Sequence, residues 1–476
     1  MGMTRSLAVG AAAAFLLPVT AQAQTAREAD LEARLRQLEG AVAALRAELA
    51  ASRAGPAVTA PPPAAAPVVL GSSTPGNSPN TSVATPRAVA ARESSVGALA
   101  AAPTTDGFRI GDTTVKLGGF VRLNVISSRY NDGEVAVGGL GKEFYLPQQI
   151  PVGGGFASRD LLFSGRQTRL VVSTATPVAG KVAKTLIEFD FALATAPAGA
   201  QRATNPYVPT FRRGFIEYGR WLVGQEWSTF QNLAVLPETT DFVGPLDGTV
   251  FNRQSLIRYT APLGQGMTLQ VAAENPQTET ALPNNPALVD TDKDRLPDMV
   301  ARVNWKAGFG DFALAGIARE LRTSTNGLED TTFGWGVSGS GKIPFGARSD
   351  LRFMATYGQG IGRYLGLGYV PDAIYSPTTN RLARIDNFAA FAAFKHGWTD
   401  TLRSTVSASY QSAEYPTGLA VTGLANAKAY SGAVNLFWSP IKGMDAGIEY
   451  RRAVRELLSG DDGVMDRIEF AIKYGF

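Results

Sequence analysis

The chain has 476 residues, of which 18% are charged and 45% hydrophobic, and its formal net charge is +4. It contains no cysteine and one histidine, His396, which excludes a disulfide scaffold, a thiol enzyme and a zinc site built from cysteine or several histidines. The small net charge gives no reason to expect a nucleic-acid partner. No Gly-x-Ser-x-Gly context accompanies the histidine, so we expect no hydrolase and no enzyme of another kind.

The first 23 residues have the order of a secretory signal peptide. A positive start ends at Arg5, an apolar stretch runs over 7–17, and Ala21-Gln22-Ala23 supplies the small residues that a signal peptidase reads. The apolar stretch is shorter than the roughly 20 residues that a membrane-spanning helix needs. We therefore predict a signal peptide over 1–23 and export from the cytoplasm.

Residues 24–53 have the pattern of a periplasmic coiled-coil helix. The apolar residues recur at alternating spacings of four and three, at Leu31, Leu35, Leu38, Val42, Leu45 and Leu49. Such a seam needs a partner, so the pattern favours a coiled coil that joins subunits, and the alternative is a solitary helix lying on another surface. Residues 54–105 are rich in Pro and Ala and lack aromatic residues, which predicts a disordered, flexible linker before a domain over 106–476.

From residue 115 onward the hydrophobic period becomes two, as in β-strands with one polar and one apolar face. Residues 402–411 alternate Leu, Ser, Val, Ala and Tyr with Arg, Thr, Ser, Ser and Gln. Sixteen such segments can be placed, and they start near residues 115, 164, 181, 211, 220, 251, 266, 298, 310, 333, 350, 383, 401, 427, 443 and 465.

Long and short connections alternate along these sixteen segments. The long ones are predicted at 129–163, 192–210, 228–250, 275–297, 321–332, 359–382, 412–426 and 453–464. An even number of antiparallel strands with short turns at one end and long loops at the other is typical of an outer-membrane barrel. The chain also ends in Phe476, in phase with the apolar face of the last segment.

The fold class predicted is therefore an all-β transmembrane barrel of 16 antiparallel strands in a bacterial outer membrane, in contact with lipid and lipopolysaccharide. The alternative is a secreted soluble β-sandwich or solenoid. A soluble protein would not need loops that alternate in length, and no short internal repeat supports a solenoid.

The polar face of the strands carries more cations than acids. The cationic candidates for the channel wall are Arg122, Arg166, Arg169, Lys184, Arg213, Arg253, Arg258, Arg302, Arg352, Arg403 and Arg451. The acids predicted on the same face are Glu188, Asp190, Glu217, Glu274, Asp350, Glu449 and Glu469. Arginines that line a pore select for anions and clamp carboxylates; the alternative is that they pair with the acids and stiffen the wall.

Loop 228–250 is the third long connection and is mostly apolar. Its charges are Glu238, Asp241 and Asp247. Such a loop can fold into the barrel as a constriction, with its acids facing the wall arginines, or it can remain an ordinary external loop; its composition favours the constriction.

Residues 290–298 contain Asp290, Asp292, Asp294 and Asp298, and alternate aspartates suit calcium. Arg295 stands where calcium loops usually have glycine, so an acidic solvated loop is the other interpretation. We expect no cofactor besides this candidate structural Ca²⁺.

The chain also resembles a known family. Arg-Gln-Thr-Arg-Leu over 166–170, Lys-Thr-Leu-Ile-Glu-Phe-Asp-Phe over 184–191 and Gly-Gln-Glu-Trp-Ser-Thr-Phe over 224–230 are similar to DcaP-like porins. The resemblance covers about 115–476 and is densest over 164–260. It implies a trimeric outer-membrane channel associated with dicarboxylates, with the arginines of 166–169 and 253–258 lining its narrow part.

We therefore expect a porin through which small anionic solutes, and (di)carboxylates in particular, diffuse passively. The alternative is a structural anchor whose periplasmic coiled coil tethers the outer membrane to a cell-wall or envelope partner.

Overall fold

The computed structural model describes residues 107–193, 207–291, 293–325 and 328–476, all within the unit Val83–Phe476. The predicted signal peptide, coiled-coil helix and linker lie outside these residues. In the part described, no helix is both long enough and apolar enough to cross a membrane.

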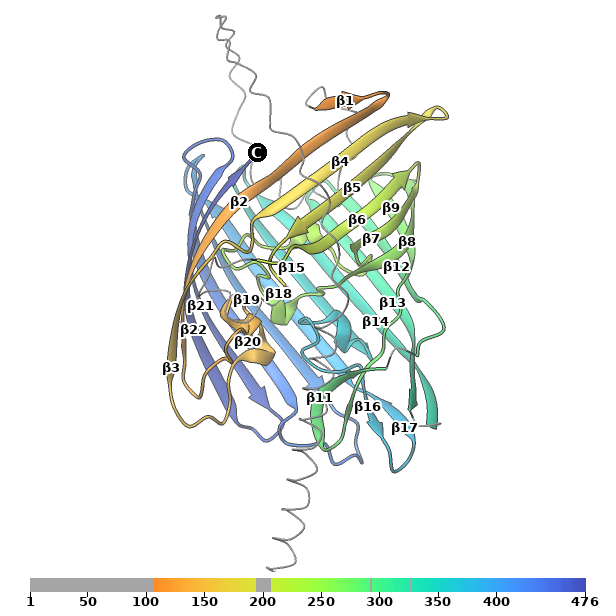
Figure 1. Ribbon diagram of the computed structural model, residues 1–476, viewed down its shortest axis with the longest axis vertical. Coiled ribbons are helices and arrows are strands. Elements are labelled where there is room, and N and C mark those ends of the chain that lie inside the picture. Colours follow the sequence, from red (N-terminus) through yellow and green to blue (C-terminus); the bar gives the residue numbers. More distant parts are fainter. Residues whose placement is uncertain (1–106, 194–206, 292, 326–327) are drawn as a thin grey trace, which may run out of the picture. The chain divides into compact units, whose positions relative to one another are not determined.

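The described residues form a closed antiparallel barrel (Figure 1). Neighbours along the chain pair with one another, and the first barrel strand, β2, pairs with the last, β22, which closes the ring. Closure leaves no strand edge unpaired in lipid, where an unpaired backbone group would be costly. The barrel strands are β2 (Thr113–Tyr130), β3 (Ser158–Ser164), β4 (Arg169–Val178), β5 (Lys181–Asp190), β6 (Thr210–Tyr218), β7 (Trp221–Trp227), β8 (Arg253–Gly264), β9 (Met267–Glu274), β12 (Asp298–Ala307), β13 (Gly310–Thr325), β14 (Leu328–Phe345), β15 (Ser349–Gln359), β18 (Asp386–Gly397), β19 (Leu402–Glu414), β20 (Asn426–Trp438), β21 (Met444–Leu457) and β22 (Asp462–Gly475).

The prediction of 16 strands is confirmed, because β3 and β4 are two halves of one strand. Both pair with β2, over Asn124–Tyr130 and Thr114–Phe120 respectively, and the chain leaves the sheet between them at 165–168. β1 (Phe108–Ile110) precedes the barrel and forms a short antiparallel hairpin with the first residues of β2.

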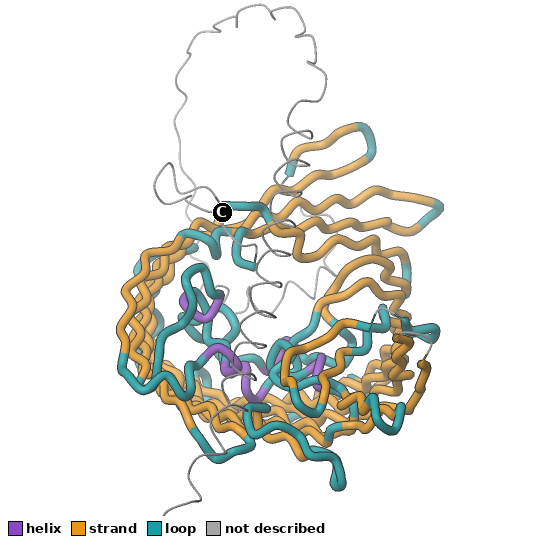
Figure 2. The backbone as a smooth tube through the Cα atoms, turned by 60° about the horizontal axis from the view of Figure 1, so that its bottom comes forward, coloured by secondary structure: helices purple, strands orange, loops and turns teal. Residues whose placement is uncertain are grey.

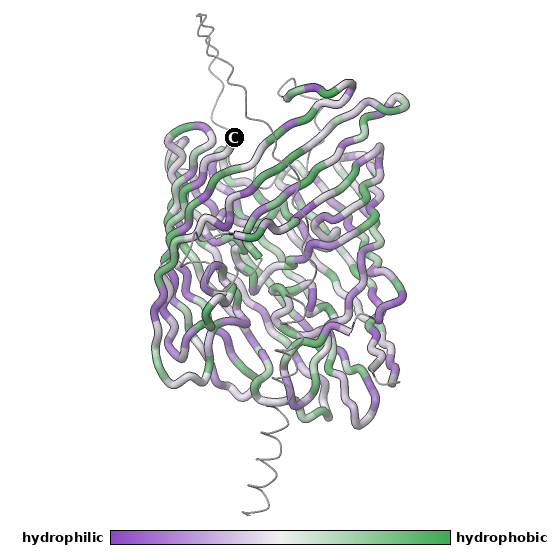
Figure 3. The backbone as a smooth tube through the Cα atoms, in the orientation of Figure 1, coloured by the Kyte–Doolittle hydropathy of each residue, from purple (hydrophilic) through white to green (hydrophobic). Residues whose placement is uncertain are grey.

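The side-chain alternation follows the predicted phase. On β20 and β21 apolar residues such as Val434 and Ile448 are exposed on the outside, whereas their polar neighbours Asn435 and Glu449 are buried. Hydrophobic and hydrophilic residues accordingly alternate along the strands in Figure 3. Exposed aromatic residues next to the short turns, Trp305, Phe345, Trp398, Trp438 and Tyr474, form the kind of girdle that lies at a membrane interface.

Two of the predicted long loops are wrong. Over 321–332, β13 and β14 pair as far as Thr325 and Leu328, and over 453–464 the pairing of β21 and β22 continues to Glu456 and Asp462. The strict apolar–polar alternation is lost in these stretches, while the backbone hydrogen bonding of the strand pairs continues.

Two other long loops contain a second, four-stranded sheet. It consists of β10 (Glu279–Leu282), β11 (Asn285–Asp290), β16 (Ala373–Ser376) and β17 (Arg381–Arg384). β10 pairs in parallel with β16, which joins loop 275–297 to loop 359–382 at the long-loop end of the barrel.

Candidate functional site: a constricted lumen

The loop after β7 lies inside the barrel. Its residues Phe230, Val235, Leu246 and Val250 are at most 1% exposed. In Figure 2 the short 3-10 helices lie within the ring of strands, and two of them, η5 (Leu233–Val235) and η6 (Leu246–Gly248), belong to this loop.

The apolar side of the loop explains an apolar patch on the inner wall. Phe230, Val235 and Val250 form one core cluster with wall residues of β12, β13, β15 and β18, among them Ile317 and Phe391. Over this part of β12, β13, β15 and β18 the inner wall is apolar, because here it packs against the loop instead of water.

Wall arginines hold the loop by its backbone. Arg258 Nη2 donates to the carbonyl oxygen of Trp227, and Arg302 Nη1 to that of Gln231. Further along the loop, Arg352 Nη1 donates to Leu236 O and Arg122 Nη2 to Thr240 O. These arginines come from β8, β12, β15 and β2, so the loop is fastened at intervals around the wall. Arginine is suited to this role because its guanidinium remains charged and offers several donors at once.

The acids of the loop have different partners. Glu238 forms a bidentate pair with Arg403 of β19, with Nε–Oε2 at 2.6 Å, and its Oε2 lies 3.9 Å from Lys395 Nζ. Asp241 accepts from the backbone N–H of Tyr145 at 2.8 Å and lies 3.6 Å from Arg467.

Asp247 is fully buried against β19 and β20 and faces no cavity arginine. It accepts hydrogen bonds from Ser409 Oγ at 2.6 Å and Ser431 Oγ at 3.1 Å. The expectation that all three acids face the opening therefore fits Glu238 and Asp241, which line the cavity, but not Asp247.

A second loop, 131–157, also enters the lumen. Phe144 and Tyr145 are 0% exposed and pack with Val243 and Leu246 of the first loop. This loop contains the short 3-10 helices η2 (Leu140–Lys142) and η3 (Pro147–Gln149). The lumen is thus narrowed from two directions.

A cavity of about 160 Å³ remains between the first loop and the wall. Its charged lining residues are Arg122, Arg169, Arg212, Arg213, Arg352, Lys395, Glu188, Glu238 and Asp241. Six of these are cationic and three are carboxylates, so the described lining has a formal charge of +3. The cavity is large enough for several water molecules.

Glu188 is the centre of the arginine cluster on this wall. Its Oε1 lies 2.6 Å from Arg212 Nε and 3.5 Å from Arg169 Nε, and its Oε2 lies 3.2 Å from Arg213 Nη1. The loop's Phe242 covers this cluster, with its ring centroid 4.7 Å from the Arg212 guanidinium carbon. Cation–π contacts of this kind favour the arginines further.

Sequence reasoning missed Arg212 because of a β-bulge. Glu188 is opposite Arg213 and Phe189 is opposite Phe211, so Arg212 is the extra residue and both arginines are 2% exposed. A strict period of two places Arg212 on the lipid side. Two adjacent arginines in a barrel strand are the one sequence clue, since an arginine facing lipid is costly. Lys395 was missed because the turn was expected to begin there, whereas β18 continues to Gly397.

The remaining predicted wall cations lie outside the cavity lining. Arg166 is buried and lies 3.6 Å from Glu143, and Lys184 Nζ lies 3.2 Å from Glu217. Arg253 lies over the Trp227 ring at 4.8 Å. Arg451 lies 2.9 Å from Glu449. Pairing with wall and loop acids is therefore observed for several of the predicted cations, and fastening of the loop is a further role that the sequence did not indicate.

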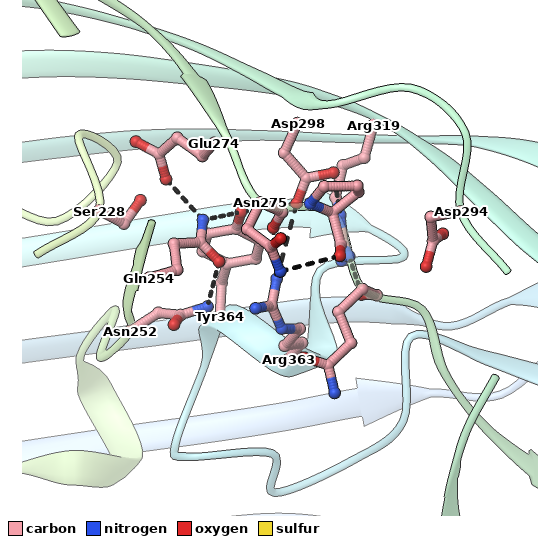
Figure 4. Close-up of polar contacts among 12 residues, drawn as sticks. Ser228, Asn252, Gln254, Glu274, Asn275, Asp294, Asp298, Arg319, Arg363 and Tyr364 are labelled. Carbon is pink, nitrogen blue, oxygen red and sulfur yellow. Dashed lines mark hydrogen bonds and ion pairs between the residues drawn. The ribbon is translucent and has the colours of Figure 1, made fainter. Parts of the chain in front are cut away.

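The predicted calcium residues do not come together. Asp298 is 0% exposed and lies 3.2 Å from Arg319 Nε, and Tyr364 donates to it at 2.6 Å (Figure 4). Asp294 accepts from the backbone N–H of Thr278, and Asp292 lies outside the described residues. No group of three or more His, Cys, Asp or Glu able to hold a metal exists in the described ranges.

Arg319 instead joins the outer loops to the wall. Its guanidinium also donates to Asp372 Oδ1 at 2.8 Å, Gly360 O at 3.0 Å and Gln277 O at 2.6 Å. Asp372 in turn accepts from the backbone N–H of Glu279. Burial first, and then repulsion from Asp372, raise the pKa of Glu279 to about 7.

Comparison with known proteins agrees with this architecture. Residues 150–476 match the DcaP outer membrane protein family. The chain belongs to this family. It is therefore an outer-membrane porin, a channel and not an enzyme, as the resemblance implied.

Solved structures share the fold. The outer membrane channel DcaP of Acinetobacter baumannii superimposes with a TM-score of 0.66 at 24% identity, over 78% of this chain and all of that one. The Vibrio cholerae outer membrane protein OmpT gives a TM-score of 0.50 at 11% identity, over 78% of this chain and all of OmpT. An anion-selective porin from Comamonas acidovorans superimposes less well, with a TM-score of 0.47 at 12% identity, over 76% of this chain and all of that one. A search of the curated proteins gave no match.

Proposed function

We propose that this DcaP-family porin is an anion-selective diffusion channel for small carboxylates, and that loop 228–250 forms its constriction. The observation that carries the proposal is the excess of three positive charges among the residues that line the cavity beside the loop. A carboxylate passing this point finds guanidinium groups that can bind it through two parallel hydrogen bonds. Cations meet a positive potential that the narrow, low-dielectric walls strengthen.

Lys395 offers the cleanest test of this proposal. The Lys395 Nζ atom lies 3.9 Å from Glu238 Oε2, a long ion pair, so replacing the lysine leaves no tightly bound acid without its partner. Single channels of the wild-type protein in a KCl gradient are expected to show a reversal potential of anion-selective sign. Lys395→Glu is expected to lower the chloride-to-potassium permeability ratio by roughly two- to fivefold, the effect of one screened charge at short range.

The matched control is Lys306→Glu. Lys306 is exposed at the end of β12 and lies outside the cavity lining, so its replacement is expected to leave the ratio unchanged. A wild-type channel that prefers potassium, or equal effects of the two replacements, would contradict the proposal. Block of the chloride current by added succinate tests the carboxylate preference separately.

We further propose a homotrimer whose subunits the heptad segment 24–53 holds together in the periplasm. Its support is the uninterrupted apolar seam of that segment, which needs a partner to bury it. Native mass spectrometry of the full chain and of a variant lacking 24–53 tests this assignment. Trimers that persist without the segment would leave cell-wall contact as its role, and monomers of the full chain would refute the trimer.

A further inference from the structure

A second cavity lies at the long-loop end of the barrel, apart from the lumen. Its volume is about 340 Å³, and it is bounded by the β10–β11 hairpin, the stretch 368–374 and the loop after β19. None of the residues that line it belongs to the cavity beside loop 228–250.

Most of the cavity wall is apolar. Leu288, Ile374 and Val421 contribute aliphatic surface, and Tyr369 and Tyr415 contribute rings. Both tyrosine hydroxyls are engaged elsewhere, since Tyr369 donates to Lys428 O and Tyr415 to Asn426 O. The rings therefore have only their apolar surface to offer to a ligand.

One cation lines this apolar cavity. Arg455 donates from Nε to Asn426 Oδ1 at 2.8 Å and from Nη1 to Ile150 O at 2.8 Å. Neither partner is charged, and within the described ranges Arg455 forms no ion pair. Its Nη2 has no hydrogen-bond partner among those residues either. Arg455 is half-buried, and it differs in this from the buried Arg213 and Arg319, which each have a carboxylate partner.

We propose that this cavity binds an amphiphilic monocarboxylate, with the carboxylate on Arg455 and the hydrocarbon body against Leu288, Ile374 and the two tyrosine rings. An unpaired guanidinium beside an apolar wall matches both parts of such a solute. Binding here goes beyond the proposed channel function, because it concerns a separate site at the outer mouth.

The surroundings favour one negative charge over two. A Cβ added to the lining residue Gly368 would lie 3.2 Å from Glu279 Oε2 and 3.4 Å from Leu288 Cδ1. The Glu279 carboxyl thus adjoins the cavity near Leu288, where its ionised form, which dominates above pH 7, repels a second carboxylate on the ligand. The cavity in the lumen has the opposite preference, because its six cations favour a solute with two negative charges.

Fluorine NMR of 4-fluorobenzoate with the full-length protein in non-ionic detergent tests the site. We expect saturable line broadening that unlabelled benzoate or octanoate reverses and that 4-fluorobenzyl alcohol, the neutral analogue, does not. Arg455→Gln is expected to weaken the outer-site component by about tenfold or more, as for the loss of a hydrogen bond to a charged group.

Ala287→Trp provides a second variant that leaves Arg455 in place. Ala287 is exposed on β11 and lines the cavity, so an indole there fills the space, whereas Val289→Trp on the same strand lies outside the lining and serves as control. Unchanged broadening in both Arg455→Gln and Ala287→Trp would overturn the proposal, as would equal binding of the alcohol. Lys395→Glu separates the two sites, because it alters the ion selectivity of the lumen and is expected to leave the Arg455-dependent component unchanged.

Discussion

Arg122 on β2 donates a hydrogen bond to the carbonyl oxygen of Thr240, which lies 118 residues further along the chain. Asn124 Nδ2 approaches the same oxygen at 3.4 Å, and the Thr240 N–H donates to Glu449 at 3.0 Å. Thr240 of the constriction loop is thus held through both its carbonyl oxygen and its N–H, by residues of β2 and β21, the two strands that pair with β22.

Arg122→Met is expected to loosen the loop at Thr240. Loss of a hydrogen bond from a charged donor costs about 1.5–3 kcal/mol, enough for this part of the loop to leave the wall for part of the time. Single-channel recordings are then expected to show larger conductance and more open-channel noise. Arg129→Met on the same strand is the control, because Arg129 is exposed on the outer face. Equal traces from the two variants would show that the hydrogen bond does not restrain the loop.

Gly248→Val is expected to displace the tip of the loop. A Cβ at this position would lie 2.4 Å from Ala390 O on β18, so any larger side chain forces η6 away from the wall. Overpacking of this size costs about 1–3 kcal/mol and also strains the contacts of Asp247. Increased conductance without loss of the folded barrel is the expected result. Gly339→Val is the control, because a Cβ there meets nothing within 4 Å.

Arg212→Leu tests whether the β-bulge turns Arg212 into the barrel, because the two possible orientations predict changes of opposite sign in the free energy of unfolding. If Arg212 faces Glu188 and Asp190, its removal leaves two buried carboxylates short of a partner and costs about 3–5 kcal/mol of unfolding free energy. If the strand were regular and Arg212 faced lipid, leucine would stabilise the barrel by about 2–4 kcal/mol. Guanidinium unfolding of the protein in detergent distinguishes the two, and Arg220→Leu at the exposed β6–β7 turn is the matched control.

The raised pKa of Glu279 predicts that the stability of the four-stranded sheet of β10, β11, β16 and β17, the outer sheet, depends on pH. The folded pKa of about 7 exceeds the ordinary value of 4.5 for a glutamate, so protonation favours the folded sheet, and stability is lost as pH rises from about 4.5 through 7. The full effect is up to about 3 kcal/mol. The protection factors of amides in 279–290, in which the intrinsic pH dependence of exchange is divided out, are expected to be higher at pH 5 than at pH 8.

Glu279→Gln is expected to remove most of this difference and to protect the outer sheet at pH 8. Glu414→Gln, an exposed acid at the end of β19, is the control. A pH effect that survives in Glu279→Gln would assign it to another group.

The barrel could be predicted from the sequence because lipid imposes a strict side-chain period. Val434 and Ile448 are apolar because each of them faces lipid. The outward and inward faces can therefore be predicted for each strand by itself. Around 164–174 the period of two is interrupted for a physical reason, since residues 165–168 leave the sheet between β3 and β4.

The site was less predictable because it depends on contacts between distant residues. The inward position of loop 228–250 followed from its apolar composition, but the partner of each acid did not: Asp247 is bound to serine hydroxyls, and only the folded barrel brings Ser409 and Ser431 to it. The inward position of Arg212 depends on a β-bulge that a strict period of two does not indicate. Asp298, predicted as a calcium ligand, instead pairs with Arg319 at 3.2 Å.

The arginines fasten the constriction loop through carbonyl oxygens, at Gln231, Leu236 and Thr240 and at Trp227 directly before it, and every amino acid supplies a carbonyl oxygen. These backbone contacts do not depend on which side chains the loop carries, in contrast to the pairs formed by Glu238, Asp241 and Asp247. Substitutions among loop residues that line the cavity, such as Leu233, Pro237 or Thr239, can change what the cavity accepts while the loop stays in place. A channel built this way can acquire a new solute preference by single replacements, without rebuilding its wall.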